Sequence, residues 1–213
     1  MNPIKAVLFD YGMVLSGPPD PAAWARIRSI TGLDEEPLHR GYWAHRHAYD
    51  RGDLTGQTYW HNVGHDAGLV LTLDQIQSLI AADLDLWGQV NLPMLAWAQY
   101  LQRIGITTGI LSNIGDAMAE GLVARFDWLA HFNARTWSHA LNLAKPDPAI
   151  YRHAAESLHT PPPNILFIDD RPENIQAAHT AGMQAIQYLD HPTFERAMKT
   201  RSLGYLLDPP STE

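Results

Sequence analysis

The feature that most constrains the fold of this chain is a set of short, largely apolar runs, each followed by a polar residue. The runs and the residues that follow them are 6–9 with Asp10, 106–111 with Ser112, and 165–168 with Asp169 and Asp170. Strands buried on both faces of a parallel sheet have this apolar character, because helices cover both faces. The carboxyl ends of such strands form one edge, where ligands of open α/β sheets bind. We therefore expect these polar side chains to share a site.

Composition is typical of a globular protein and argues against several kinds of partner. The chain has 213 residues, 46% hydrophobic and 18% charged, enough for one core with a sizeable insertion. A formal charge of −8 argues against a nucleic-acid-binding surface, and the absence of cysteine excludes disulfides and thiolate zinc sites. Only four apolar residues separate Lys5 from Asp10, and no run approaches about 18 apolar residues. We expect no membrane partner and a cytoplasmic protein, either monomer or homodimer.

The segment between the first and second runs predicts a separate helical unit. A proline-rich stretch at 17–21 interrupts the strand pattern, and apolar residues then recur at helical spacing to about residue 89. Thr72 and Gln75 fit a capping box at the start of the last of four expected helices. The predicted division is an inserted four-helix lobe at 17–89 and a main domain formed by 1–16 and 90–213.

From Pro93 onward, helices and strands are expected to alternate, as in doubly wound α/β folds. The expected helices are 95–104, 116–128, 148–158 and 172–181, and the expected strands are 106–111, 132–136, 164–169 and 184–188. Asp147 followed by Pro148 is a typical helix start, because Asp caps the first turn and proline fits there. Residues 209–213 are expected to form a frayed polar tail. The predicted fold is a Rossmann-like, doubly wound parallel sheet.

Four motifs, in this order, resemble those of the haloacid dehalogenase superfamily of hydrolases. They are Phe9–Leu15, Leu111–Asn113, Lys145–Pro148 and Ile168–Asn174, the last continuing to Ala181-Gly182-Met183. The resemblance implies a Rossmann-like core with a helical cap inserted just after the first motif, where residues 17–89 lie. Such a cap closes over the active site and excludes water during the chemistry.

The resemblance and the chemistry of the residues together assign roles at the expected sheet edge. Asp10 is the expected nucleophile, because a carboxylate can attack phosphorus to give an acyl phosphate and split hydrolysis into two steps. Lys145, held in an extended loop by the proline after it, would neutralise the nucleophile and the phosphate. Ser112 would donate its hydroxyl to a phosphate oxygen. The backbone amides of Asn113 and Ile114 would assist phosphate binding, as at helix N-termini.

The acidic pair predicts a magnesium site. Mg²⁺ prefers oxygen ligands and usually keeps several waters, so one or two protein carboxylates suffice. By resemblance, the ligands would be Asp10, the backbone carbonyl of Gly12, and Asp170. Asp169 would support a ligand or the loop from beside the metal. Asn174 either orders the ligands of the metal or is an ordinary amide on a helix face, and both readings stay open.

One position departs from the pattern of most phosphatases in this family. They carry a second Asp two residues after the nucleophile as general acid and base, whereas this chain has Gly12. General acid–base catalysis contributes about 10²–10⁴-fold to the rate. Without the second Asp, three alternatives stay open: the leaving group departs without a proton, another residue supplies the proton, or turnover is slow. The cap histidines His45 and His47 are the first candidates, because histidine titrates near neutral pH. A positive φ would also account for glycine at this position.

Together, these features favour a Mg²⁺-dependent phosphatase acting on a small phosphorylated metabolite, with sugar phosphates among the candidates. The first alternative is a haloacid dehalogenase, which attacks carbon with the same Asp; Asp169 and Asp170 argue against it, because dehalogenases of this fold typically lack an acidic pair. The second alternative is a catalytically weak or non-catalytic binding protein on the same fold, which Gly12 supports. The cap selects the substrate, and its sequence alone does not identify one.

Overall fold

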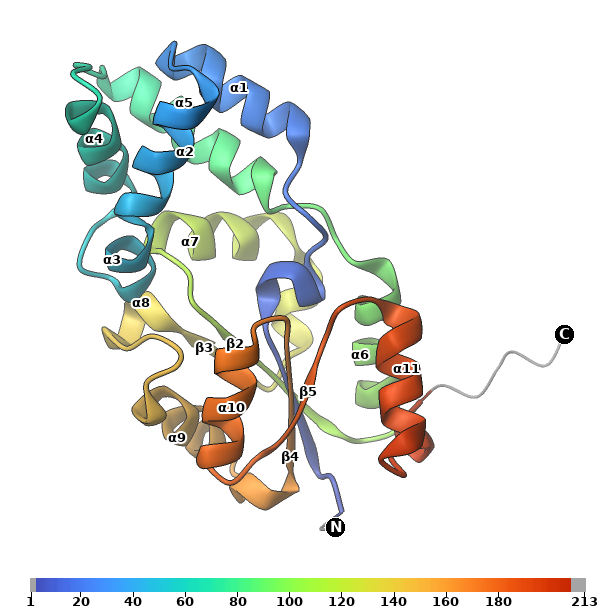
Figure 1. The fold of residues 1–213 in the computed structure, drawn as a ribbon. Helices are drawn as coiled ribbons and strands as arrows, with labels where there is room; N and C mark the ends of the chain where they lie inside the picture. The colour runs from blue at the N-terminus through green and yellow to red at the C-terminus, as the bar shows by residue number, and fades with distance from the viewer. Residues whose placement is uncertain (1–2, 208–213) are drawn as a thin grey trace, which may run out of the picture.

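The protein is built around a five-stranded parallel sheet with helices on both faces. The computed structural model describes residues 3–207, so the tail expected at 209–213 lies outside the described part. The strand order is β3-β2-β1-β4-β5, and every neighbouring pair is parallel (Figure 1). The strands are β1 Ala6–Phe9, β2 Thr107–Ser112, β3 Ala134–Trp137, β4 Ile165–Asp169 and β5 Gln184–Gln187. The predicted doubly wound α/β fold is confirmed.

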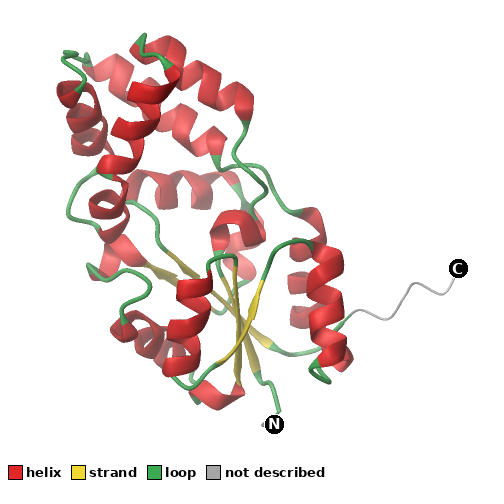
Figure 2. Cartoon of the chain, viewed as in Figure 1, coloured by secondary structure: helices red, strands yellow, loops and turns green. Residues whose placement is uncertain are grey.

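Helices cover the two faces of the sheet, as Figure 2 shows, and alternate side chains of β1 pack against different helices. The helices of this part are α6 Leu92–Arg103, α7 Asp116–Arg125, α8 Ser138–Leu141, α9 Pro148–Ser157, α10 Pro172–Thr180 and α11 His191–Thr200. Val7 and Phe9 belong to one hydrophobic core with α6, α7 and α11. Ala6 and Leu8 belong to another with α9 and α10. Burial on both faces explains why this strand has no polar alternation.

Most expected boundaries are correct to within a few residues, and the differences have local causes. The helix expected at 116–128 ends at Arg125, because Phe126 adopts an extended conformation and a short 3₁₀ turn follows. Helix α11 was not expected, although its start has an identifiable pattern. Asp190 caps it by accepting from the amide of Thr193 at 2.7 Å, and Phe194 is buried one turn later.

A helical lobe, formed by α1–α5, follows β1 and packs over the carboxyl edge of the sheet. Its helices are α1 Pro21–Thr31, α2 Glu35–Ala44, α3 Arg46–Arg51, α4 Gly56–Asp66 and α5 Leu73–Leu86. They share a hydrophobic core of their own, in which Tyr42, Tyr59 and Trp60 are almost completely buried. The capping box predicted at Thr72 and Gln75 is present at the start of α5.

The lobe has five helices rather than the expected four, because the second expected helix is broken at His45. The amide of His45 donates to the carbonyl of Trp43 instead of to the residue four positions earlier, so α2 ends and α3 begins at Arg46. The break gives α3 its own direction, and Arg46, His47 and Asp50 of α3 line a pocket at the sheet edge. Among residues 3–207, no helix has the length and apolar character needed to cross a bilayer.

Candidate active site

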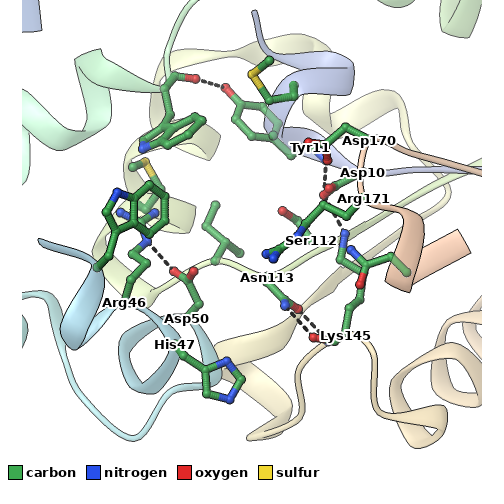
Figure 3. A pocket seen from close by; sticks show the side chains of 17 residues that line it. Asp10, Tyr11, Arg46, His47, Asp50, Ser112, Asn113, Lys145, Asp170 and Arg171 are labelled. Carbon is green, nitrogen blue, oxygen red and sulfur yellow. Dashed lines mark hydrogen bonds and ion pairs between the residues drawn. The ribbon is translucent and has the colours of Figure 1, made fainter. Parts of the chain in front are cut away.

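The carboxyl edge of the sheet and the helical lobe enclose a pocket of about 470 Å³ (Figure 3). Asp10 follows β1, Ser112 ends β2, and the acidic pair follows β4, so three neighbouring parallel strands bring these side chains to one edge. The amide of Asp10 continues the strand pairing by donating to the carbonyl of Ile168 at 2.8 Å. Of the predicted site residues, Asp10, Gly12, Ser112, Asn113, Lys145, Asp170 and Asn174 all line the pocket.

Lys145 is the positive centre of this edge. Its side chain is 1% exposed, and its Nζ lies 2.9 Å from Asp10 Oδ1 and 2.6 Å from Asp169 Oδ2. Burial disfavours the charged ammonium, but the two carboxylates raise the pKa of Lys145 above its ordinary value. Burial raises the pKa of Asp10 to about 7, Lys145 opposes this rise, and Asp169 adds to it. A buried cation is thus held between two carboxylates.

Asn113 fixes the loop that carries Lys145, which the sequence did not indicate. Its Oδ1 accepts from the backbone amide of Lys145 at 2.7 Å, and its Nδ2 donates to the carbonyl of the same residue at 2.9 Å. The expectation that the amide of Ile114 helps to bind phosphate is wrong, because this amide donates to Ser138 Oγ at 2.8 Å. The Asn113 side chain therefore positions the lysine rather than facing a ligand freely.

The two acids of the pair have different surroundings. Asp169 is fully buried, and its oxygens accept from the amide of Arg171 at 2.8 Å, from Asn174 Nδ2 at 3.0 Å and from Lys145. Asp170 lines the pocket and is partly exposed, and burial together with Asp169 raises the pKa of its carboxyl. Asn174 is 3% exposed, so it is a buried partner of Asp169 and not an ordinary amide on a helix face.

The acidic residues of this edge can hold a metal ion. Asp10, Asp169 and Asp170 each offer a carboxylate oxygen, and these oxygens lie within 4.8 Å of one another. Hard divalent cations prefer such an all-oxygen set. Because the oxygens of Asp169 already accept several hydrogen bonds, Asp10 and Asp170 are the members that face the pocket for an ion.

Gly12 is not explained by its backbone conformation. Its φ is −61°, and a Cβ added there would have no heavy atom within 4 Å. The suggestion of a positive φ at Gly12 is therefore wrong; the left-handed residue of this turn is Met13, with φ of 58°. The turn has room for a side chain at position 12, so no steric reason accounts for the absence of a carboxylate.

The two cap histidines lie in different places. His45 pairs with Asp66 at 2.8 Å and does not line the pocket, whereas the exposed His47 does line it. Sequence reasoning missed an ion pair between Arg46 and Asp50 on the side of the pocket formed by α3. Arg46 Nε donates to Asp50 Oδ1 at 2.9 Å, and both residues line the pocket from α3. The i, i+4 spacing of Arg46 and Asp50, within a segment rich in aromatic residues, is the sequence pattern that could have indicated this ion pair.

Comparison with known proteins identifies the family. The sequence profile of haloacid dehalogenase-like hydrolases matches residues 4–182, which contain all four motifs. The chain is a haloacid dehalogenase-like hydrolase. Phosphatase MT3486 of Mycobacterium tuberculosis is 29% identical over 231 residues, covering 96% of this hydrolase and 97% of that protein. Bifunctional epoxide hydrolase 2 of Sus scrofa is 30% identical over 127 residues. That match covers 58% of this hydrolase but only 23% of the relative's length.

Solved structures show the same fold. The HAD family enzyme BT-2542 of Bacteroides thetaiotaomicron matches with a TM-score of 0.77 and 18% identity, over 92% of this hydrolase and 99% of that chain. Its complex with magnesium and inorganic phosphate matches with a TM-score of 0.73 and 19% identity, over 87% and 94% of the two chains. The L-2-haloacid dehalogenase RSc1362 matches with a TM-score of 0.69 and 21% identity, over 90% and 89%.

Proposed function

We propose that this hydrolase is a Mg²⁺-dependent phosphatase that cleaves a small phosphorylated metabolite through an aspartyl-phosphate intermediate on Asp10. The observation that carries the proposal is the arrangement of Asp10 beside Lys145 Nζ, at 2.9 Å, with Asp170 in the same pocket. A phosphate brings negative charge to a carboxylate nucleophile, so the site needs compensating positive charge. Lys145 and a metal ion would supply that charge.

The surroundings of Asp10 suit nucleophilic attack by one oxygen. Lys145 Nζ and the amide of Tyr11, at 2.7 Å, both contact Oδ1. In the proposal, Oδ2 attacks phosphorus, the bond to the leaving oxygen breaks, and water later cleaves the acyl phosphate. Ser112, buried at the end of β2, would donate its hydroxyl to a phosphate oxygen. Orientation by fixed contacts lowers the barrier, because the reacting atoms are already positioned.

Mg²⁺ would be held by Asp10, by Asp170 and by the backbone carbonyl of Gly12. When bound, it supplies positive charge that offsets the charges of the phosphate and the nucleophile. Asp169 would orient this centre through Lys145 and Asn174. The magnesium and phosphate bound to BT-2542 and the phosphatase name of the Mycobacterium tuberculosis relative support this assignment by similarity.

The size of the pocket supports a small-molecule substrate. Its volume of about 470 Å³ suits a phosphorylated metabolite, and sugar phosphates stay among the candidates. Trp43, which is 48% exposed, and Trp87 line it on the side of the lobe. We propose that residues 17–89 act as the cap that selects this substrate.

The dehalogenase alternative shares the fold and the nucleophile, and RSc1362 is an example of it. Dehalogenation needs no metal, so an acidic pair beside the nucleophile, with Asp170 lining the pocket, favours phosphate chemistry. The non-catalytic alternative rests on Gly12 alone. Cytoplasmic location and a monomeric or homodimeric state stay predictions.

One assay separates the three functions. The protein is expected to release phosphate from p-nitrophenyl phosphate when Mg²⁺ is present, and to lose this activity in EDTA. The Asp10→Asn variant is the matched control, because the amide has nearly the same shape but is a poor nucleophile. Halide release from an L-2-haloacid without metal would instead establish a dehalogenase. Binding of phosphate and Mg²⁺ without turnover of either substrate would establish a binding protein.

A further inference from the structure

We propose that Asp50, on α3 of the helical lobe, donates the proton to the leaving oxygen and so replaces the acid that is absent at Gly12. This inference rests on the proposed phosphatase function and adds a catalytic residue to it. Asp50 and Asp10 line the same pocket from opposite sides, one from the lobe and the other from the sheet edge (Figure 3). The leaving group would lie between them, because phosphate occupies the side of Asp10.

The carboxyl group of Asp50 is held in place. Its side chain is only 15% exposed, and Arg46 Nε donates to Oδ1 at 2.9 Å. Arg46 itself is anchored by the buried Asp83 at 3.1 Å and stacks near the ring of Tyr42. The fixed guanidinium of Arg46 and a hydrogen bond from the backbone amide of Gly115 therefore orient the carboxyl group, which lines the pocket.

Helix α3 is docked tightly against the main domain, so Asp50 has a defined distance to the sheet edge. The backbone carbonyl of Asp50 accepts a hydrogen bond from Ser138 Oγ. A Cβ added at Gly115 would lie 2.1 Å from the ring of Tyr49, and one added at Gly52 would lie 2.4 Å from the carbonyl oxygen of His139. These close approaches require glycine and bring the two parts of the chain together at Asp50.

The surroundings of Asp50 favour a proton donor. Burial raises the pKa of Asp50 to about 6, Arg46 opposes this rise, and Asp83 adds to it. A general acid is most effective when its pKa lies near the working pH. Arg46 cannot serve, because a guanidinium does not release its proton in proteins. His47 is the remaining candidate on this wall, but its side chain is exposed, whereas that of Asp50 is held by Arg46.

The proton balance is complete with Asp50 in this role. As Asp10 attacks phosphorus, the bond between phosphorus and the leaving oxygen breaks, and its electron pair stays on that oxygen. The protonated Asp50 gives this oxygen its proton, and the alcohol departs. In the second step, the Asp50 carboxylate accepts a proton from the water that attacks phosphorus. Inorganic phosphate leaves, Asp10 is freed as a carboxylate, and Asp50 is protonated again.

The test compares two esters of similar size, p-nitrophenyl phosphate and benzyl phosphate, with the Mg²⁺-loaded protein. The first leaving group departs without a proton, whereas the alkyl one needs it. In the Asp50→Asn variant, kcat for benzyl phosphate should fall by about 10²-fold or more, and kcat for the aryl ester should fall far less. Asp53→Asn is the matched control, because this acid follows α3, pairs with Arg51 and does not line the pocket. It should change neither rate.

Several outcomes would overturn the inference. Equal losses on both esters would indicate a structural role, and a higher KM with unchanged kcat would indicate substrate binding. A selective loss in His47→Asn but not in Asp50→Asn would move the role to the histidine.

If Asp50→Asn does not fold, wild-type rates across a series of phenyl phosphates decide instead. A shallow dependence on leaving-group pKa is expected, and a steep one contradicts a proton donor. Failure of the wild type on both esters would refute the phosphatase function itself.

Discussion

Replacing Lys145 with methionine tests the charge arrangement of the site through stability, without reference to any substrate. Methionine keeps an unbranched side chain, slightly shorter than that of lysine, and removes the ammonium together with its contact over the ring of Phe167. Asp10 and Asp169 would then be two buried carboxylates without their shared cation. Removing one partner of a buried ion pair costs about 3–5 kcal/mol, because the remaining charge loses its compensation. For a chain of this size, that corresponds to a fall in Tm of roughly 6–20 °C.

The loss should depend on pH in a defined direction. The pKa of Asp10 in the folded wild type is about 7, above its ordinary value of 3.8, and removal of Lys145 raises it further. A group whose pKa is raised by folding stabilises the protein below its unfolded pKa and loses this contribution as the pH rises through the folded value. The variant should therefore be less destabilised at pH 5 than at pH 8. Added Mg²⁺ should recover part of the loss.

Urea unfolding followed by circular dichroism, at pH 5 and pH 8 with EDTA, measures these free energies. Lys199→Met is the matched control, because this lysine is 66% exposed and its contact with Glu195 is 3.9 Å long, so it should change stability by less than about 1 kcal/mol. Adding Asp10→Asn to the Lys145 variant should restore stability by removing one of the two charges. A free energy of unfolding within about 1 kcal/mol of wild type at pH 8 would refute the reasoning.

Four further predictions concern single side chains. Asp10→Asn should abolish phosphate release while Tm is kept, and residual activity within about tenfold of wild type would contradict a nucleophilic role. Asp170→Ala should remove most Mg²⁺ binding in a calorimetric titration; unchanged binding would move the site to Asp169 or elsewhere. Gly12→Asp should fold normally with Mg²⁺, because no heavy atom lies within 4 Å of the added Cβ. Added to Asp50→Asn, it should restore turnover of benzyl phosphate. Failure to restore turnover would mean that a side chain at position 12 does not reach the leaving oxygen. Between pH 5 and 8, wild type should lose roughly 1.4 kcal/mol more stability than Asp50→Asn, because the raised pKa of Asp50, about 6, stabilises the fold only at low pH. Equal slopes would contradict a raised pKa.

The sequence by itself determined the sheet and the polar residues at its edge. The two central strands β1 and β4 read as continuous apolar runs, and the acidic residues at their ends reach the carboxyl edge whatever the details of packing. Helix starts such as Asp147 and Thr72 were equally predictable, because a cap depends on residues within one turn. The number and order of the motifs were enough to indicate the family, which the comparison of residues 4–182 then established.

Tertiary structure decided the contacts between distant parts of the chain. Asn113 clamps the loop of Lys145 across 32 residues, and Asp50 reaches the pocket only because α2 breaks at His45 and α3 docks on the main domain. Neither feature has a local pattern, since each depends on which side chains meet after the lobe packs over the sheet. The division between Asp169 and Asp170 was expected from the family resemblance, and the tertiary structure supplied the donors that surround Asp169. Adjacent in sequence, they differ because alternate residues at a strand end face opposite sides, one toward buried donors and the other toward the pocket.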